Sequence, residues 1–230
     1  MVILGAAVGI AAAWLLGETA QAGAIASGRR IGPSFVALIA NRAFLGYTLA
    51  LAFNTTSFFV FIAGAPYIVV EVMGRDPNVY GLFFMVNAAG YMLGNLVSGR
   101  HGRRLGSERL AAIGTAISFA AVSLELVVMV VLPWTPATLF LPLAINAIGN
   151  GLTIPGGTAS ALSVRPDLAG TAAGLMGAAQ LGLGAIGSVV VGLVVPSWPP
   201  ALVVGMLFCV GVGWLALAWA QRGAAPTTKS

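Results

Sequence analysis

Charged residues are scarce in this sequence: they make up 7% of its 230 positions, whereas apolar residues make up 59%. A soluble domain of this size would expose large apolar patches, so the composition excludes an ordinary soluble protein and favours lipid-facing helices. The single cysteine, Cys209, excludes a disulfide framework and a cysteine-based metal site. Basic residues outnumber acidic ones by 11 to 6, but they form no basic stripe, which argues against nucleic-acid binding.

The sequence also lacks the residues that catalysis needs. The sole histidine, His101, lies in a charged connection, and no apolar stretch contains an aspartate or a nucleophile–base set. We therefore expect no enzyme, no metal site and no cofactor. A seven-span receptor or light-driven pump is another class to consider. Retinal needs a lysine within a span, and the only lysine, Lys229, lies in the tail, so that pigment is excluded.

What the sequence does have is six long apolar stretches. A helix needs roughly 20 mostly apolar residues to cross the hydrocarbon of a bilayer. Hydrocarbon offers no partner to unpaired backbone groups, so each stretch is predicted to be a helix and the protein to be all-α. Glu125 is the only charged residue within them. The six predicted spans are 43–70, 80–99, 110–132, 138–164, 171–195 and 201–220.

The connections between these spans alternate in charge. Segments 18–42, 100–109, 165–169 and the tail 221–230 together hold ten of the eleven basic residues. The other connections hold only Arg75. By the positive-inside rule, the basic set and the C-terminus face the cytoplasm of a multi-pass membrane protein.

A shorter apolar stretch, 1–17, precedes the six spans. One interpretation is a signal peptide, but the positively charged flank of such peptides is missing. The interpretation we favour is that the chain starts within a longer protein and that 1–17 is the end of a preceding transmembrane helix. Segment 18–42 is then a cytoplasmic linker, in which Pro33 either begins a short surface helix or belongs to an unstructured tether. The bundle is 43–220, and 221–230 is a cytoplasmic tail.

The six spans divide into two groups of three, 43–132 and 138–220. The first span of each group carries mid-span asparagine followed by proline: Asn54 in one, and Asn146 with Asn150 in the other. With three spans per group, the second group enters the membrane from the opposite side. This arrangement predicts two inverted three-helix repeats, a common plan among transporters.

Polar residues within the spans are the candidates for function. Several are uncharged and recur at a spacing of four, which places them on one helical face. Such groups on four of the six helices predict a shared wet cavity, although each one taken alone is as well explained by a hydrogen bond between neighbouring helices. The predicted cavity residues are Asn54, Asn87, Tyr91, Asn146, Asn150 and Gln180.

Two further features within the spans have competing interpretations. Glu125 is a candidate proton site, and an ion pair or an outer-leaflet contact explains it equally well. Pro155, followed by Gly156 and Gly157, predicts a bend that serves either as a gating hinge or as a static kink.

Four stretches resemble a known family. The run GNLVSGRHGRRLGSER, with Arg100, Gly102, Arg103 and Arg104, resembles the cytoplasmic loop motif of the major facilitator superfamily, with Gly99 where an acidic residue is common. The runs RAFLGYTLALAF, GAPYIVVEVMGRDPNVYGLFFMVNAAGYMLGN and IPGGTASALSVRPDLAGTAAGLMGAAQ narrow the resemblance to the Bcr/CflA-type drug-resistance transporters. Together they cover about residues 33–220.

The resemblance implies the C-terminal six-helix half of a twelve-helix fold in a bacterial inner membrane. It also implies a secondary transporter that exports drugs or small metabolites by alternating access, driven by proton entry. The partners would be the lipid bilayer, the substrate, protons and a missing N-terminal half. Two alternatives stay open: a carrier that takes up or exports a sugar or amino acid, and an inert truncated fragment.

Overall fold

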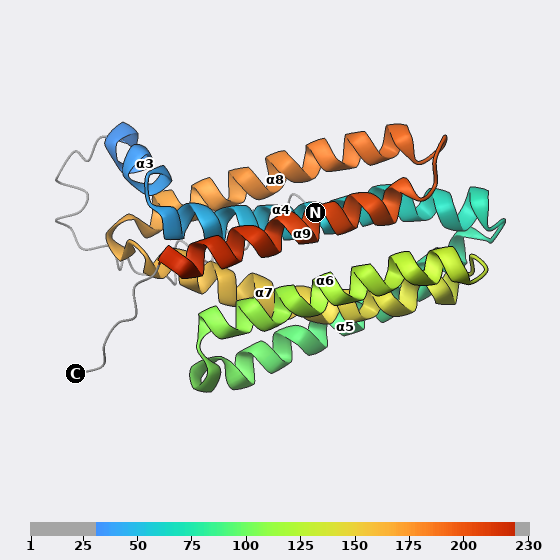
Figure 1. The fold of residues 1–230 in the computed structure, drawn as a ribbon, viewed down its shortest axis with the longest axis horizontal. Coiled ribbons are helices and arrows are strands. Elements are labelled where there is room, and N and C mark those ends of the chain that lie inside the picture. The colour runs from blue at the N-terminus through green and yellow to red at the C-terminus, as the bar shows by residue number, and fades with distance from the viewer. Residues whose placement is uncertain (1–30, 224–230) are drawn as a thin grey trace, which may run out of the picture. The chain divides into compact units, whose positions relative to one another are not determined.

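The structure, a computed structural model, describes residues 31–223. The chain divides after Val36 into two units, and the bundle discussed below lies within the second, 37–230. Every element in the described part of the chain is helical (Figure 1). In chain order they are α3 (Ile31–Ile39), α4 (Arg42–Tyr67), the π-helix η1 (Ile68–Val72), α5 (Pro77–Leu105), α6 (Ser107–Val131), α7 (Pro136–Ser163), the 3-10 helix η2 (Pro166–Leu168), α8 (Ala169–Val194) and α9 (Ala201–Gly223).

Six of these helices are long and apolar enough to cross a membrane. Each overlaps one of the six predicted spans, and the all-α membrane fold is confirmed. Short polar residues start several of them. The Asn41 side chain accepts a hydrogen bond from the Phe44 backbone at the start of α4, and Thr135 forms a capping box with Thr138 at the start of α7. Such caps satisfy backbone N–H groups that have no partner within the helix.

The segment predicted as a basic loop, 100–109, is instead almost entirely helical. Helix α5 continues to Leu105, and Gly106 alone separates it from α6. Arginine is a good helix former, and the negative end of the helix dipole favours the cations of its last turn, Arg103 and Arg104. Gly106 has a φ of 82°, a left-handed conformation in which glycine is unstrained, so a single residue suffices for the reversal.

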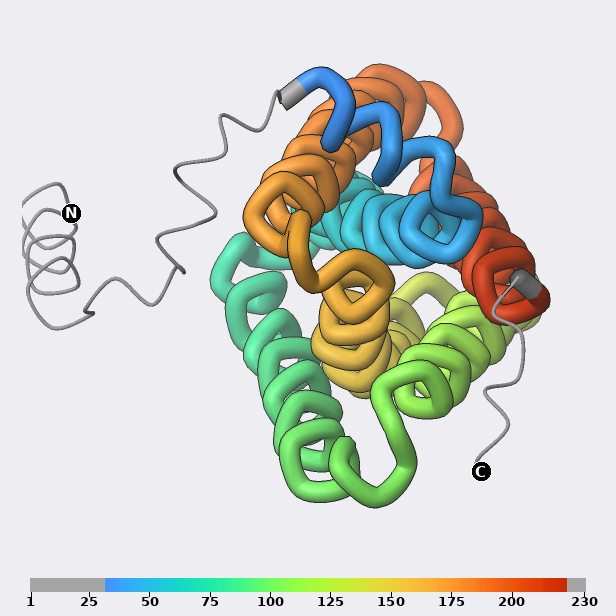
Figure 2. The backbone as a smooth tube through the Cα atoms, turned by 90° about the vertical axis from the view of Figure 1, so that its left-hand side faces the viewer, coloured from blue at the N-terminus to red at the C-terminus, as the bar shows by residue number. Residues whose placement is uncertain are grey.

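The helices pair in a symmetrical way. Helix α4 packs against α8 and α9, and α7 packs against α5 and α6. Exchanging α4, α5 and α6 for α7, α8 and α9 turns one set of pairs into the other. Figure 2 shows α4 and α7 in the middle of the bundle with the other four around them. This pairing is what two inverted repeats of three helices produce.

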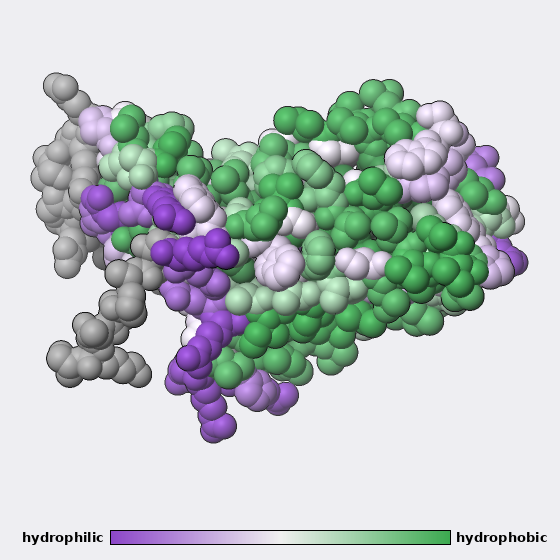
Figure 3. Space-filling view, viewed as in Figure 1, coloured by the Kyte–Doolittle hydropathy of each residue, from purple (hydrophilic) through white to green (hydrophobic). Residues whose placement is uncertain are grey.

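Polar residues gather at one end of the bundle, where α4 begins and α5 ends (Figure 3). The arginines near this end include Arg42, Arg103, Arg165 and Arg222, and the positive-inside rule predicts that it faces the cytoplasm.

Within segment 18–42, the predicted short helix is present as α3. Helix α9 continues to Gly223, so the predicted tail 221–230 begins as helix. The predicted remnant of a preceding helix, 1–17, and the first part of the linker lie outside the described residues.

Candidate functional site

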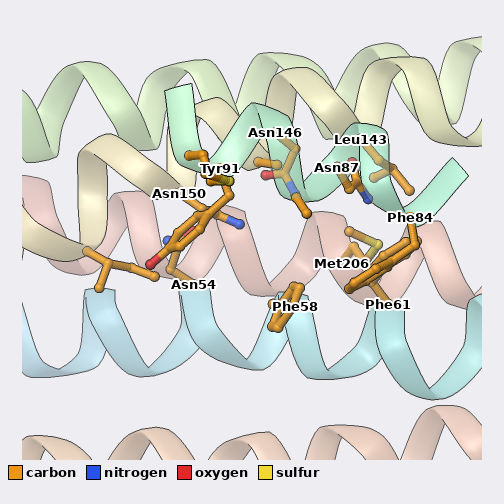
Figure 4. A pocket seen from close by; sticks show the side chains of 14 residues that line it. Asn54, Phe58, Phe61, Phe84, Asn87, Tyr91, Leu143, Asn146, Asn150 and Met206 are labelled. Carbon is orange, nitrogen blue, oxygen red and sulfur yellow. The ribbon is translucent and has the colours of Figure 1, made fainter. Parts of the chain in front are cut away.

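A cavity of about 350 Å³ lies among helices α4, α5, α7 and α9. Five of the six predicted cavity residues line it (Figure 4): Asn54, Asn87, Tyr91, Asn146 and Asn150. On α5 and on α7 the two polar residues are four positions apart, so each pair lies on one face of its helix. Asn54 comes from α4, which belongs to the same repeat as α5. The structure thus brings together residues that are up to 96 positions apart in the sequence.

The four asparagines are deeply buried, with exposed fractions of 1% for Asn54, 7% for Asn87 and 5% for both Asn146 and Asn150. Only Asn150 has a side-chain partner: its Oδ1 accepts a hydrogen bond of 3.2 Å from the Ser118 hydroxyl on α6. Both amide atoms of Asn54 and the Oδ1 atoms of Asn87 and Asn146 have no protein partner. Leaving a buried polar group unpaired costs about 1–3 kcal/mol, so we expect water or a ligand to supply hydrogen bonds to these amides.

Gln180, the sixth predicted residue, does not line this cavity. It lies on α8, where its Oε1 accepts a hydrogen bond of 3.0 Å from Thr55 of α4, and its Nε2 donates to the Met176 carbonyl. These contacts match the alternative interpretation of a bond between neighbouring helices. The sequence could not show whether Gln180 faces the cavity or bonds to a neighbouring helix, since its partner Thr55 directly follows the cavity residue Asn54.

The cavity also has an aromatic wall that the sequence analysis missed. Phe61 of α4 and Phe84 of α5 stack with their ring centroids 6.3 Å apart and their planes 7° apart. Phe58 lies between this pair and Asn54 (Figure 4), and it is 41% exposed. A signal for this wall was present: positions 54, 58 and 61 share one face of α4, and 84, 87 and 91 share one face of α5.

Glu125 lies elsewhere, on α6, in a recess of about 10 Å³ beside Trp134 and Thr138. Its side chain is 1% exposed, and its Oε2 has no hydrogen-bond partner. None of the basic side chains in the described part of the chain forms an ion pair with it. The structure therefore gives no support to the ion-pair interpretation, while a proton-binding role stays a prediction.

The Pro155–Gly157 segment does not interrupt α7, which is one helix from Pro136 to Ser163. Both glycines are packing positions. A Cβ at Gly156 would lie 2.6 Å from the Ser107 carbonyl oxygen of α6, and a Cβ at Gly157 would lie 2.9 Å from Leu51 of α4. The gating hinge stays a prediction. The two glycines allow α7 to pack closely against α6 and α4.

The residues of the cytoplasmic motif lie on the last turns of α5, not in a loop. Arg100, Arg103 and Arg104 are exposed. Gly102 and Arg103 line a separate hollow of about 540 Å³ near the start of α6. It is distinct from the cavity that holds the asparagines.

No family model matches the chain. Two curated proteins are similar to it. The uncharacterized MFS-type transporter YdgK of Bacillus subtilis is 28% identical over 156 residues, which are 68% of this chain and 39% of that protein. The bicyclomycin resistance protein homolog of Haemophilus influenzae is 28% identical over 183 residues, which are 79% of this chain and 44% of that protein. The resemblance to major facilitator transporters is confirmed.

The chain spans less than half the length of the curated relatives it matches. Its six membrane-capable helices, with α4 and α7 at their centre, agree with a half-bundle of this fold and with a multi-pass membrane protein. The cavity asparagines therefore lie on one wall of a bundle that is similar to part of a transporter.

Proposed function

We propose that the chain forms the C-terminal half of a secondary transporter in a bacterial inner membrane, and that the transporter exports drugs or small metabolites by alternating access. The observation that carries this proposal is the cavity. Polar side chains from α4, α5 and α7 converge within the spans, at a depth where hydrocarbon offers them no hydrogen bonds. Transport sites near the middle of the membrane, between repeats, have this character.

An N-terminal half is the partner we propose. In the most apolar stretch of α8 only 11% of the residues are buried, and in that of α5 22%, against 61% in α7. Since α5 also contributes Asn87 and Tyr91 to the cavity, a second bundle placed against it would supply the opposite wall. The partial coverage of both relatives supports the same proposal.

Proton entry is the driving force we propose, and Glu125 is the candidate coupling group. A carboxyl group that is 1% exposed and has one unpaired oxygen is poorly placed to carry a permanent charge. We expect Glu125→Gln to preserve insertion and ligand binding, because the amide has nearly the same shape, while removing the dependence of export on the proton gradient. Transport by this variant that still follows an imposed pH gradient would exclude the role.

A chimera tests the transport proposal directly. The chain would replace the C-terminal half of the Haemophilus relative, and cells would be challenged with bicyclomycin and a panel of other toxic compounds. We expect resistance from the chimera and none from the 230-residue chain alone. Asn87→Leu or Asn146→Leu should change the range of compounds, whereas Asn95→Leu should not, because Asn95 lies outside the central cavity. A chimera that inserts but protects against no compound would contradict transport, and full resistance from the chain alone would contradict its being a half.

A further inference from the structure

The chemistry of the cavity wall points to the kind of molecule it accepts. We infer that the cavity selects uncharged molecules that carry a flat ring beside a carbonyl, amide or hydroxyl group. This inference rests on the proposed function, since it names the class of ligand for the same cavity. Three observations carry it: the charge of the wall, the state of its amides and the position of its rings.

The first observation is the charge. None of the described residues that line the cavity is charged. Helix α7 has no charged residue, and α4 has none after Arg42, at its cytoplasmic end. Glu125, the one buried acid between residues 31 and 223, belongs to a separate recess. A carboxylate or ammonium group in this cavity would lose its hydration without gaining a counter-charge from the described residues, and such burial is costly.

The second observation is the state of the amides. Each asparagine side chain offers both a donor and an acceptor. Asn54 leaves both unused, and Asn87 and Asn146 each leave Oδ1 unused. The terminal torsion of asparagine is broad and roughly two-fold, so rotation about it can turn either amide atom toward the cavity. A ligand with its own carbonyl and N–H or O–H groups satisfies these atoms without bringing in a charge.

The third observation is the order of the groups along the cavity. Figure 4 shows Asn54, Asn150 and Tyr91 toward one end, and Phe61, Phe84 and Met206 toward the other, where Asn87 also lies. Phe58 lies between the two sets. The stacked rings of Phe61 and Phe84 line this end, and an aromatic ring packs against such rings in offset or edge-on fashion. A ligand with a flat apolar ring and a polar group beside that ring matches this order.

Three probes with the same ring separate charge from size: 2-acetamidonaphthalene, trimethyl(2-naphthyl)ammonium and 2-naphthoate. Their binding to the purified 230-residue chain in lipid nanodiscs would be followed by their fluorescence, with empty nanodiscs subtracted. We expect the neutral amide to bind at least about tenfold more tightly than either ion, which corresponds to a difference of about 1.4 kcal/mol.

Variants connect this preference to the wall. Asn146→Asp places a carboxyl group of nearly the same size in the wall, and at an alkaline pH that ionises this carboxyl we expect the preference to reverse in favour of the ammonium probe. Asn87→Leu should weaken binding of the amide probe toward that of the ions. Asn95→Leu, the same chemical change on α5 outside the cavity, should leave all three affinities unchanged. Circular dichroism and thermal unfolding would establish that each variant is folded.

Equal or tighter binding of either ion by the unmodified chain would overturn the inference, and so would binding of no probe above empty nanodiscs. An unchanged preference in Asn146→Asp would also overturn it. The proposed function fails separately. A chimera that exports nothing, together with selective binding of the amide probe, would contradict transport and leave the ligand class intact. Export of cations together with preferential binding of the ammonium probe would support transport and contradict the ligand class.

Discussion

The α5–α7 contact and the α4–α8 contact each join the two repeats and are interchanged when the repeats are exchanged, yet they are built differently. Between α5 and α7 the backbones themselves meet. A Cβ at Gly90 would lie 2.6 Å from the Ala144 carbonyl oxygen, one at Gly151 would lie 2.5 Å from the Tyr91 carbonyl oxygen, and one at Gly94 would collide with the Ile148 carbonyl oxygen. The close approach holds Asn87 and Tyr91 of α5 beside Asn146 and Asn150 of α7.

Between α4 and α8, side chains of one helix fill the space above glycines of the other. The Phe59 ring covers Gly184, and the Thr56 methyl group covers Gly187. Two hydrogen bonds add to this contact, from Thr55 to Gln180 and from Ser188 to the Phe59 carbonyl. Side chains can adopt other rotamers and backbone cannot, so the α5–α7 contact should tolerate change less than the α4–α8 contact.

The largest expected effect is therefore on the α5–α7 side. Gly94→Ala should destabilise the chain by about 3 kcal/mol, at the upper end of what overpacking costs, because the obstacle is the Ile148 carbonyl oxygen. Chemical unfolding in detergent would measure the change. Gly99→Ala on the same helix, where nothing lies within 4 Å, is the matched control. Equal stability of the two variants would remove the distinction between the contacts.

A smaller effect is expected at the equivalent contact. Gly184→Ala would place a methyl group against the Phe59 ring, at a cost of about 1 kcal/mol. Because the obstacle is a side chain, adding Phe59→Leu should recover much of the loss in a double-mutant cycle. No single side-chain truncation should rescue Gly94→Ala. Failure of Phe59→Leu to rescue Gly184→Ala would indicate that α4 and α8 are locked through their backbones as well.

The sequence could reveal the six helices but not which glycines hold them together. Small residues at Gly170 and Gly174, and at Gly184, Ser188 and Gly192, have the spacing of packing motifs. In the structure Gly184 and Ser188 contact α4, while nothing lies within 4 Å of a Cβ at Gly170, Gly174 or Gly192. The spacing indicates that another helix can approach closely, but it does not show which helix does so.

The same reasoning selected the cavity asparagines and Gln180. Buried amides need partners, and this need identified Asn87 with Tyr91 and Asn146 with Asn150 as inward-facing pairs. A partner can be a ligand, water or another helix, and only the fold shows that Gln180 bonds to Thr55. The aromatic wall was missed because phenylalanine in a membrane helix is expected against lipid as much as in a cavity.

A still smaller effect is expected when the Thr55–Gln180 hydrogen bond of the α4–α8 contact is removed. Thr55→Val removes the donor while keeping the shape, and we expect a loss of about 0.6 kcal/mol, typical of hydrogen bonds between membrane helices. A double-mutant cycle with Gln180→Leu should give a coupling energy of that size. A coupling of zero would mean that the packing of Phe59 and Thr56 on the two glycines accounts for the contact.

The smallest expected effect is at Gly182, on the open face of α8. Nothing lies within 4 Å of a Cβ there, so Gly182→Ala should change the stability of the 230-residue chain by less than about 0.5 kcal/mol. In the assembled protein, the same substitution tests whether the N-terminal half contacts α8. If the proposed N-terminal half packs closely on α8, the added methyl group obstructs that approach and the chimera loses resistance while the isolated chain stays unchanged. Resistance unaffected by Gly182→Ala, and by the bulkier Gly182→Leu, would mean that this stretch of α8 faces lipid and that the partner docks elsewhere.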